Sequence, residues 1–170
     1  MKNSRFETLF LCTGNSCRSI IAEALLQRHG LGDFIAYSAG SQPRGQVNPL
    51  ALKILEENNH PLDGFRSKSW DEFANNPEID LDFVITVCDN AANETCPAWP
   101  GQPMTAHWGI EDPDRPDLSE AEQIRLMKKI YWELDSRIKL LVALPLDKLD
   151  KLSLQQQLHD IGKHKETEPA

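Results

Sequence analysis

The chain has 170 residues, of which 40% are hydrophobic and 26% are charged, a composition that is ordinary for a globular protein. Its 18 lysines and arginines are outnumbered by 26 aspartates and glutamates, so the net charge of −8 argues against a general nucleic-acid-binding role. No apolar run approaches the roughly 18 residues of a membrane span, and the apolar stretch near the N-terminus is too short for a signal peptide. We therefore expect a cytoplasmic protein with one domain over residues 1–162 and a polar tail over residues 163–170, with neither nucleic acid nor a membrane as partner.

The first half of the chain alternates short apolar runs with helical patterns. In chain order, the sequence predicts a strand over residues 6–11, a helix over 19–30, a strand over 34–40, a helix over 48–59 and a short helix over 69–74. Asn48 can cap the helix over 48–59 through its side chain, and Pro49 suits the first helical position. These two residues predict where that helix begins.

The second half continues the alternation. It predicts a strand rich in β-branched residues over 81–88, a weaker strand over 103–108, a long amphipathic helix over 119–144 and a leucine-rich helix over 145–162. Ser119 and Glu122 fit a capping box at the start of the long helix. Strands that alternate with helices indicate an α/β fold, in which a mostly parallel sheet has helices on both faces.

The stretch CTGNSCRS, residues 12–19, joins the first strand to the first helix. A loop that runs into a helix N-terminus points unpaired N–H groups into one concavity and favours an anion there. Gly14 permits a tight backbone path, Asn15 tolerates a left-handed conformation, and the planar guanidinium of Arg18 matches two oxygens of a tetrahedral oxyanion. Such a loop places Cys12 as a thiolate nucleophile under the oxyanion, with Ser19 as a hydrogen-bond donor to the sulfur. The residues expected to bind the oxyanion are Thr13, Gly14, Asn15, Ser16, Cys17 and Arg18.

Two cysteines lie at the carboxyl ends of predicted strands, where ligands gather in parallel sheets. Cys12 follows the first strand, and Cys88 closes the strand over 81–88. If these strands are neighbours, about 4.8 Å separates them, and a disulfide needs Cα atoms roughly 4.4–6.8 Å apart. The two thiols could therefore meet. In a reducing cytoplasm a disulfide between them would be transient and catalytic.

Several motifs together resemble one known family. The stretches LFLCTGNSCRS, YSAGS, RSKSWDEF, TVCDNA followed by CP, and HWGIEDP are similar to those of arsenate reductases built on the low-molecular-weight protein tyrosine phosphatase fold. The likeness covers nearly the whole chain. It implies a three-layer fold with a four-stranded parallel sheet in the order 2-1-3-4, and it implies no cofactor and no metal. The loop alone would not separate a reductase from a phosphatase.

The resemblance also implies roles for three further residues. In such reductases a second cysteine, here Cys88, attacks Cys12, and a third, here Cys96, attacks Cys88, so that arsenate is reduced to arsenite. Asp112 matches the general acid of the family. The family's phosphatases carry a tyrosine after this Asp-Pro pair, whereas this chain has Asp114. The implied partners are arsenate, with phosphate or sulfate as competing anions, and thioredoxin or another thiol reductant.

Several alternatives stay open at this point. A low-molecular-weight phosphatase that hydrolyses phosphotyrosine or small phosphoesters shares the first step, and a redox sensor or oxyanion-binding module needs no turnover. Cys88 and Cys96 could be incidental cysteines. Cys12 could be a structural residue and Asp112 part of an Asp-Pro turn. A zinc site is disfavoured because the cysteines lack paired Cys-x2-Cys spacing.

Two positions depart from the family pattern. Cys17 lies inside the loop, and we expect it to be dispensable. Some relatives bind a potassium ion with residues that match Asn15, Glu23 and Ser38, together with an aspartate where this chain has Lys68. The ammonium of Lys68 could take the place of the cation, and a solvated lysine is the alternative.

Overall fold

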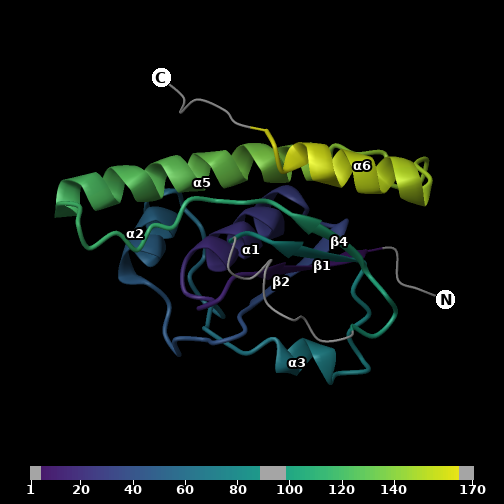
Figure 1. Ribbon diagram of the computed structural model, residues 1–170, viewed down its shortest axis with the longest axis horizontal. Helices are drawn as coiled ribbons and strands as arrows, with labels where there is room; N and C mark the ends of the chain where they lie inside the picture. The colour runs from purple at the N-terminus through teal and green to yellow at the C-terminus, as the bar shows by residue number, and fades with distance from the viewer. Residues whose placement is uncertain (1–4, 89–98, 165–170) are drawn as a thin grey trace.

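Four parallel strands form a sheet in the computed structural model, which describes residues 5–88 and 99–164. The strands are β1 (Phe6–Leu11), β2 (Phe34–Ala39), β3 (Phe83–Thr86) and β4 (Met104–His107). They lie in the order β2-β1-β3-β4, and each neighbouring pair is parallel (Figure 1). The predicted fold class and strand order are confirmed. In particular, β1 and β3, which lead to Cys12 and Cys88, are neighbours.

Helices cover the two faces of the sheet unequally. They are α1 (Arg18–His29), α2 (Pro49–Glu57), α3 (Asp71–Ala74), α5 (Glu120–Val142) and α6 (Lys151–Ile161). In Figure 1, α5 and α6 run along one side of the molecule, beyond α1, and the short α3 lies on the opposite side of the sheet. The predicted three layers are therefore a thick helical layer, the sheet and a thin layer around α3. None of the helices in the described ranges is long and apolar enough to cross a membrane.

The sheet divides the hydrophobic core into two parts, because successive side chains of a strand point to opposite faces. Phe10 joins the larger core beneath α1 and α5, whereas Leu9 and Leu11 join a smaller core with Phe73 of α3. All four side chains are buried, and each contributes about 1.5–3 kcal/mol to stability. The near-continuous apolar sequence of β1 thus follows from burial on both faces.

Two helix starts follow their predicted caps. Asn48 Oδ1 accepts a hydrogen bond from Leu50 N at 2.8 Å, with Pro49 at the first helical position of α2. Ser119 and Glu122 exchange both hydrogen bonds of a capping box at the start of α5. Caps of this kind contribute about 1 kcal/mol each, and both predictions are confirmed.

Two predicted element boundaries are wrong. The helix predicted over 145–162 begins only after Asp150, because Asp150 Oδ1 caps it by accepting from Ser153 N at 2.7 Å. The strand predicted over 81–88 is shorter, because β3 pairs with β4 over only four residues on that side. The shorter strand leaves Cys88 in the connection that follows β3.

Candidate active site

The sulfur of Cys12 lies at the carboxyl end of β1, where the strand passes into the anion loop, residues 12–18. Cys12 is 4% exposed. Its Sγ is 2.9 Å from Ser19 Oγ in the first turn of α1, and Asn15 Nδ2 donates to the same Oγ at 2.8 Å. Because this Oγ already accepts from Asn15, its own hydrogen can bond the sulfur, an arrangement that stabilises a thiolate.

Backbone hydrogen bonds turn the carbonyl groups of the anion loop outward. Gln42 N donates to Thr13 O at 2.9 Å, and Arg44 N donates to Gly14 O at 3.0 Å. Because the described peptide bonds are all trans, the N–H group that follows each carbonyl points the opposite way, toward the inside of the loop. Asn15 has a φ of 44°, the left-handed conformation that asparagine tolerates. The loop therefore presents backbone donors at the N-terminus of α1, where an anion is favoured.

Gly40, just after β2, lets a second segment approach the anion loop closely. A Cβ atom at this position would lie 2.4 Å from Thr13 O and 2.7 Å from Cys12 O, closer than side chains tolerate. On its other side, Gly40 N donates to Lys68 O and Gly40 O accepts from Trp70 N, both at 2.9 Å. Only glycine fits between these two segments, which explains the glycine of the YSAGS motif.

Arg18 and Asp112 meet beside the anion loop. Arg18 Nη1 donates to Ile110 O at 2.9 Å, and Arg18 Nη2 lies 3.6 Å from Asp112 Oδ1. The side chain of Asp112 is 58% exposed, so a carboxyl there can exchange protons with water. Asp112 Oδ1 also accepts from Asp114 N at 2.9 Å, so the Asp-Pro turn considered as an alternative is present as well.

A cavity of about 340 Å³ opens over the anion loop. Its lining consists of Cys12, Thr13, Gly14, Ser16, Cys17, Arg18, Gln42, Arg44, Asn48, Asp112, Pro113 and Asp114. The cavity thus unites the candidate nucleophile, Cys12, with the candidate acid, Asp112, and its two arginines favour an anionic ligand.

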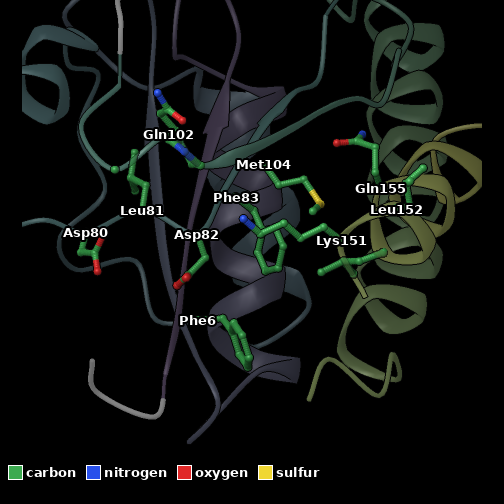
Figure 2. A pocket seen from close by; sticks show the side chains of 13 residues that line it. Phe6, Asp80, Leu81, Asp82, Phe83, Gln102, Met104, Lys151, Leu152 and Gln155 are labelled. Atoms are coloured by element: carbon green, nitrogen blue, oxygen red, sulfur yellow. The ribbon is translucent and has the colours of Figure 1, made fainter. Parts of the chain in front are cut away.

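A larger cavity, of about 600 Å³, lies at the other end of the strands, where they begin. Figure 2 shows Phe6, Phe83 and Met104 in its lining, and these are the first residues of β1, β3 and β4. Ligands of parallel sheets gather at the carboxyl ends of the strands instead. The described residues that line the larger cavity include no cysteine and no arginine. The chemistry of the side chains therefore points to the smaller cavity as the oxyanion site.

The remaining cysteines differ in their surroundings. Cys88 is 2% exposed, and its Sγ lies 3.8 Å from Thr13 Oγ1, a hydrogen-bonding distance for sulfur, so Cys88 borders the anion loop. Cys17 Sγ donates to Met127 Sδ at 3.2 Å. Burial raises the pKa of the Cys17 thiol, which keeps it protonated and unreactive. Cys96 lies outside the described residues.

Comparison with known proteins agrees with this geometry. The family model of low molecular weight phosphotyrosine protein phosphatase matches residues 7–155. The arsenate reductase of Bacillus licheniformis is 36% identical over 132 residues, which cover 76% of this chain and 90% of that protein. This chain belongs to the arsenate reductases of the low molecular weight phosphatase family. The family and the enzyme class predicted from the motifs are confirmed.

Solved structures of arsenate reductases resemble the chain over most of its length. One, an arsenate reductase in the phosphate binding state, has a TM-score of 0.66 and 27% identity, with 81% of this chain and 97% of that chain covered. The thioredoxin-dependent arsenate reductase of Corynebacterium glutamicum has a TM-score of 0.61 and 28% identity, with 83% of this chain and 62% of that chain covered.

The ammonium of Lys68 lies in a buried polar cluster beside the anion loop. Lys68 is 8% exposed, and its Nζ donates to Arg66 O at 2.9 Å and to Ser38 Oγ at 3.4 Å. The same Nζ lies 4.0 Å from Glu23 Oε1, which accepts from Ser38 Oγ at 2.5 Å. The alternative of a solvated lysine is therefore wrong. In addition, Lys68 N donates to Asn15 Oδ1 at 2.9 Å, which links this cluster to the anion loop.

Burial acts on both charges of this cluster. It raises the pKa of Glu23 and lowers the pKa of Lys68, while the opposite charge of each partner acts against the shift.

Among residues 5–88 and 99–164, no group of three or more histidine, cysteine, aspartate or glutamate side chains could hold a metal ion.

Two residues that contact the anion loop were not among the predicted site residues, although Ser67 lies within the RSKSWDEF motif. Arg44 lines the cavity, packs against Gly14 and forms an ion pair with Asp114 at 3.1 Å. Ser67 Oγ donates to Gly14 O at 3.0 Å. Both residues lie in irregular segments, where periodicity offers no signal. For Arg44, the one available cue is its position in a Gly/Pro-rich stretch directly after YSAGS.

Proposed function

We propose that this enzyme reduces arsenate to arsenite with electrons from two of its own thiols. The observation that carries the proposal is the position of Cys88, which is buried after β3, next to β1, and 3.8 Å from Thr13 of the anion loop. A phosphatase needs no second thiol there, because water completes its reaction. The identity of the Bacillus licheniformis relative as an arsenate reductase supports the same assignment.

The first step is nucleophilic attack by Cys12 on bound arsenate. The backbone N–H groups of the anion loop and the guanidinium of Arg18 hold the arsenate oxygens, and phosphate or sulfate would compete because they share this shape and charge. As the Cys12 thiolate attacks arsenic, Asp112 gives a proton to the departing oxygen, which leaves as water. Arsenic stays in the +5 state, now bonded to the Cys12 sulfur.

The second step transfers the electrons. The Cys88 thiolate attacks the Cys12 sulfur, so the S–S bond forms as the S–As bond breaks. The electron pair of the S–As bond stays on arsenic, which falls to the +3 state and leaves as arsenite. Cys96 then attacks Cys88 and releases Cys12 as a thiolate. The enzyme is left with a Cys88–Cys96 disulfide.

An external thiol reductant must reduce that disulfide before the next cycle. We assign this role to thioredoxin, because the product is a protein disulfide and the Corynebacterium glutamicum relative is thioredoxin-dependent. Another thiol reductant, such as glutathione with glutaredoxin, is the alternative outcome of the assay. A cycle of this kind suits a reducing cytoplasm.

Single-turnover assays of two cysteine variants test the relay. Cys96→Ala should release arsenite once and then stop as a Cys12–Cys88 disulfide, which mass mapping would identify. Cys88→Ala should release no arsenite above background. Hydrolysis of p-nitrophenyl phosphate serves as the internal control, because water completes that reaction and any such activity should survive in both variants.

Multiple turnovers by folded Cys88→Ala would contradict the relay. In that case a phosphatase acting on phosphotyrosine or small phosphoesters becomes the better assignment. Thermal unfolding of each variant separates lost chemistry from lost stability, because Cys88 is buried and its truncation leaves a small cavity.

A further inference from the structure

Arg137 is a buried arginine of α5 to which the reaction steps above assign no role. It is 1% exposed. Its Nη2 donates to Glu133 Oε1 at 3.1 Å, its Nη1 to Gly109 O at 3.2 Å and its Nε to His164 O at 3.1 Å. Burying a guanidinium is unfavourable unless its donors are satisfied, and burial lowers the pKa of Arg137. Two of its three partners are backbone carbonyls of separate segments, so Arg137 ties these segments together.

Gly109 belongs to the acid segment, residues 108–112, which leads from β4 to Asp112. Trp108 N and Ile110 N donate to the carbonyls of the two residues at the end of β3 and just after it, at 2.7 and 3.1 Å. One edge of the acid segment is therefore fixed to the sheet. The positions of its carbonyl groups depend on other partners.

Two guanidinium groups bind consecutive carbonyls of the acid segment. Arg137 Nη1 binds Gly109 O at 3.2 Å, and Arg18 Nη1 binds Ile110 O at 2.9 Å. Arg18 Nη2 is also the group that lies 3.6 Å from Asp112 Oδ1. Loss of the Arg137 contact would free the carbonyl next to the one that orients Arg18, three residues before Asp112.

The C-terminal part of the chain closes over the same segment. Trp108 Nε1 donates to Leu158 O at 3.0 Å. A Cβ atom at Gly162 would lie 2.6 Å from a backbone oxygen of β4, and Arg137 Nε binds His164 O just beyond. Figure 1 shows α6 continuing the line of α5 next to β4. These three contacts come from residues beyond 155, where the match to the family model ends.

We propose that Arg137 is a positioning residue for the general acid. By binding Gly109 O and His164 O together, it holds the acid segment against the end of α6 and so fixes Asp112 and the orientation of Arg18. The C-terminal segment thereby becomes part of the framework of the active site. This inference rests on the proposed role of Asp112, and the experiment below separates the two.

The test is a double-mutant cycle between Arg137 and Asp112, read as the rate of arsenite release in a single turnover. Arg137→Gln should lower that rate about tenfold, because small displacements of a catalytic group cost up to about 100-fold. The inhibition constant for phosphate should rise less than about threefold, because the anion loop is unchanged. In an Asp112→Asn background, Arg137→Gln should cost less than about twofold, because the acid that it positions is already lost. Arg137→Lys should restore part of the rate.

Glu133→Gln is the matched control, since it removes the ion pair of Arg137 and leaves both carbonyl contacts in place. Its rate should stay within about twofold of the wild type. Equal losses from Arg137→Gln in both backgrounds would overturn the positioning role, because a general loss of structure acts independently of Asp112. If Arg137→Gln does not fold, Arg137→Lys takes its place in the cycle. Equal losses of rate from Arg137→Lys in the wild-type and Asp112→Asn backgrounds would then overturn the positioning role. An unchanged rate in Asp112→Asn alone would instead overturn the proposed acid.

Discussion

Ser19 Oγ lies 2.9 Å from Cys12 Sγ and accepts a hydrogen bond from Asn15 Nδ2 at 2.8 Å. The amide therefore fixes which way the hydroxyl hydrogen points. A sulfur that receives this hydrogen is stabilised as the anion, and the anion is the form that attacks arsenic or phosphorus. In the proposed reaction, this pair of residues turns a loop that binds oxyanions into one that reacts with them.

Replacing the nucleophile should abolish both activities of the fold. In Cys12→Ser the hydroxyl stays protonated in the same surroundings, so we expect neither arsenite from arsenate nor phosphate from p-nitrophenyl phosphate. Binding of phosphate should persist, because the donors of the anion loop are unchanged, and a phosphate-dependent rise in melting temperature would report it. Turnover of either substrate by this variant would refute the site.

Removing the hydroxyl next to the sulfur should weaken the nucleophile. A hydrogen bond to a charged group contributes about 1.5–3 kcal/mol, so Ser19→Ala should slow alkylation of Cys12 by iodoacetamide at pH 6.5 by about tenfold or more. Mass spectrometry of the alkylated site gives the rate. Ser153→Ala, an exposed position on α6, is the control and should react like the wild type. Equal alkylation rates in all three proteins would contradict the role of Ser19.

The buried ammonium of Lys68 should make the enzyme insensitive to potassium. Its Nζ already contacts Arg66 O and Ser38 Oγ and faces Glu23. Arsenate reduction by the wild type should therefore change less than about twofold between sodium and potassium buffers. Lys68→Asp should lose activity in sodium and recover it in potassium, whereas Lys68→Met should lose activity in both. A steep rise of wild-type activity with potassium would show that the ammonium does not replace the cation.

A buried histidine should make stability depend on pH. His60 is 6% exposed, and its Nε2 lies 2.6 Å from Tyr131 OH. Burial lowers the pKa of His60 from 6.5 to about 4, with smaller contributions from Arg28 and His29 and an opposing one from Asp135. Between these pH values the unfolded chain binds a proton at His60 that the folded protein does not. The free energy of unfolding therefore falls as the pH drops from 6.5 toward 4, by at most about 3 kcal/mol from this group.

Urea unfolding of His60→Gln at pH 7 and pH 4.5 measures this effect. Glutamine keeps a hydrogen-bonding group for Tyr131 but does not titrate, so the loss of stability on acidification should be about 2 kcal/mol smaller than in the wild type. His159→Gln, at an exposed position of α6, should show the wild-type loss. Identical losses in all three proteins would mean that His60 is not the titrating group.

Features of this protein that depend on short-range interactions could be predicted from the sequence. Asn48 caps α2 through a residue two positions away, and Ser119 and Glu122 form a capping box within one turn. One contact within the anion loop region is equally local, because Asn15 and Ser19 are four residues apart. Such contacts depend on residues that are close in sequence, so their spacing is a reliable signal. The order of the strands was predicted from the likeness of several such stretches to one family.

The tertiary structure decided what depends on contacts between distant residues. The sequence left open whether Lys68 is solvated or takes the place of a cation, and its burial beside Glu23, Ser38 and Asn15 arises only when β2 and α1 pack together. Arg137 likewise reaches Gly109 across 28 residues and His164 across 27. Neither contact leaves a periodic pattern, because each is set by the packing of whole elements and not by the spacing along one of them. A buried charge needs partners, and the fold determines which residues these are. Because the partners are distant in sequence, the spacing of residues along the chain does not identify them.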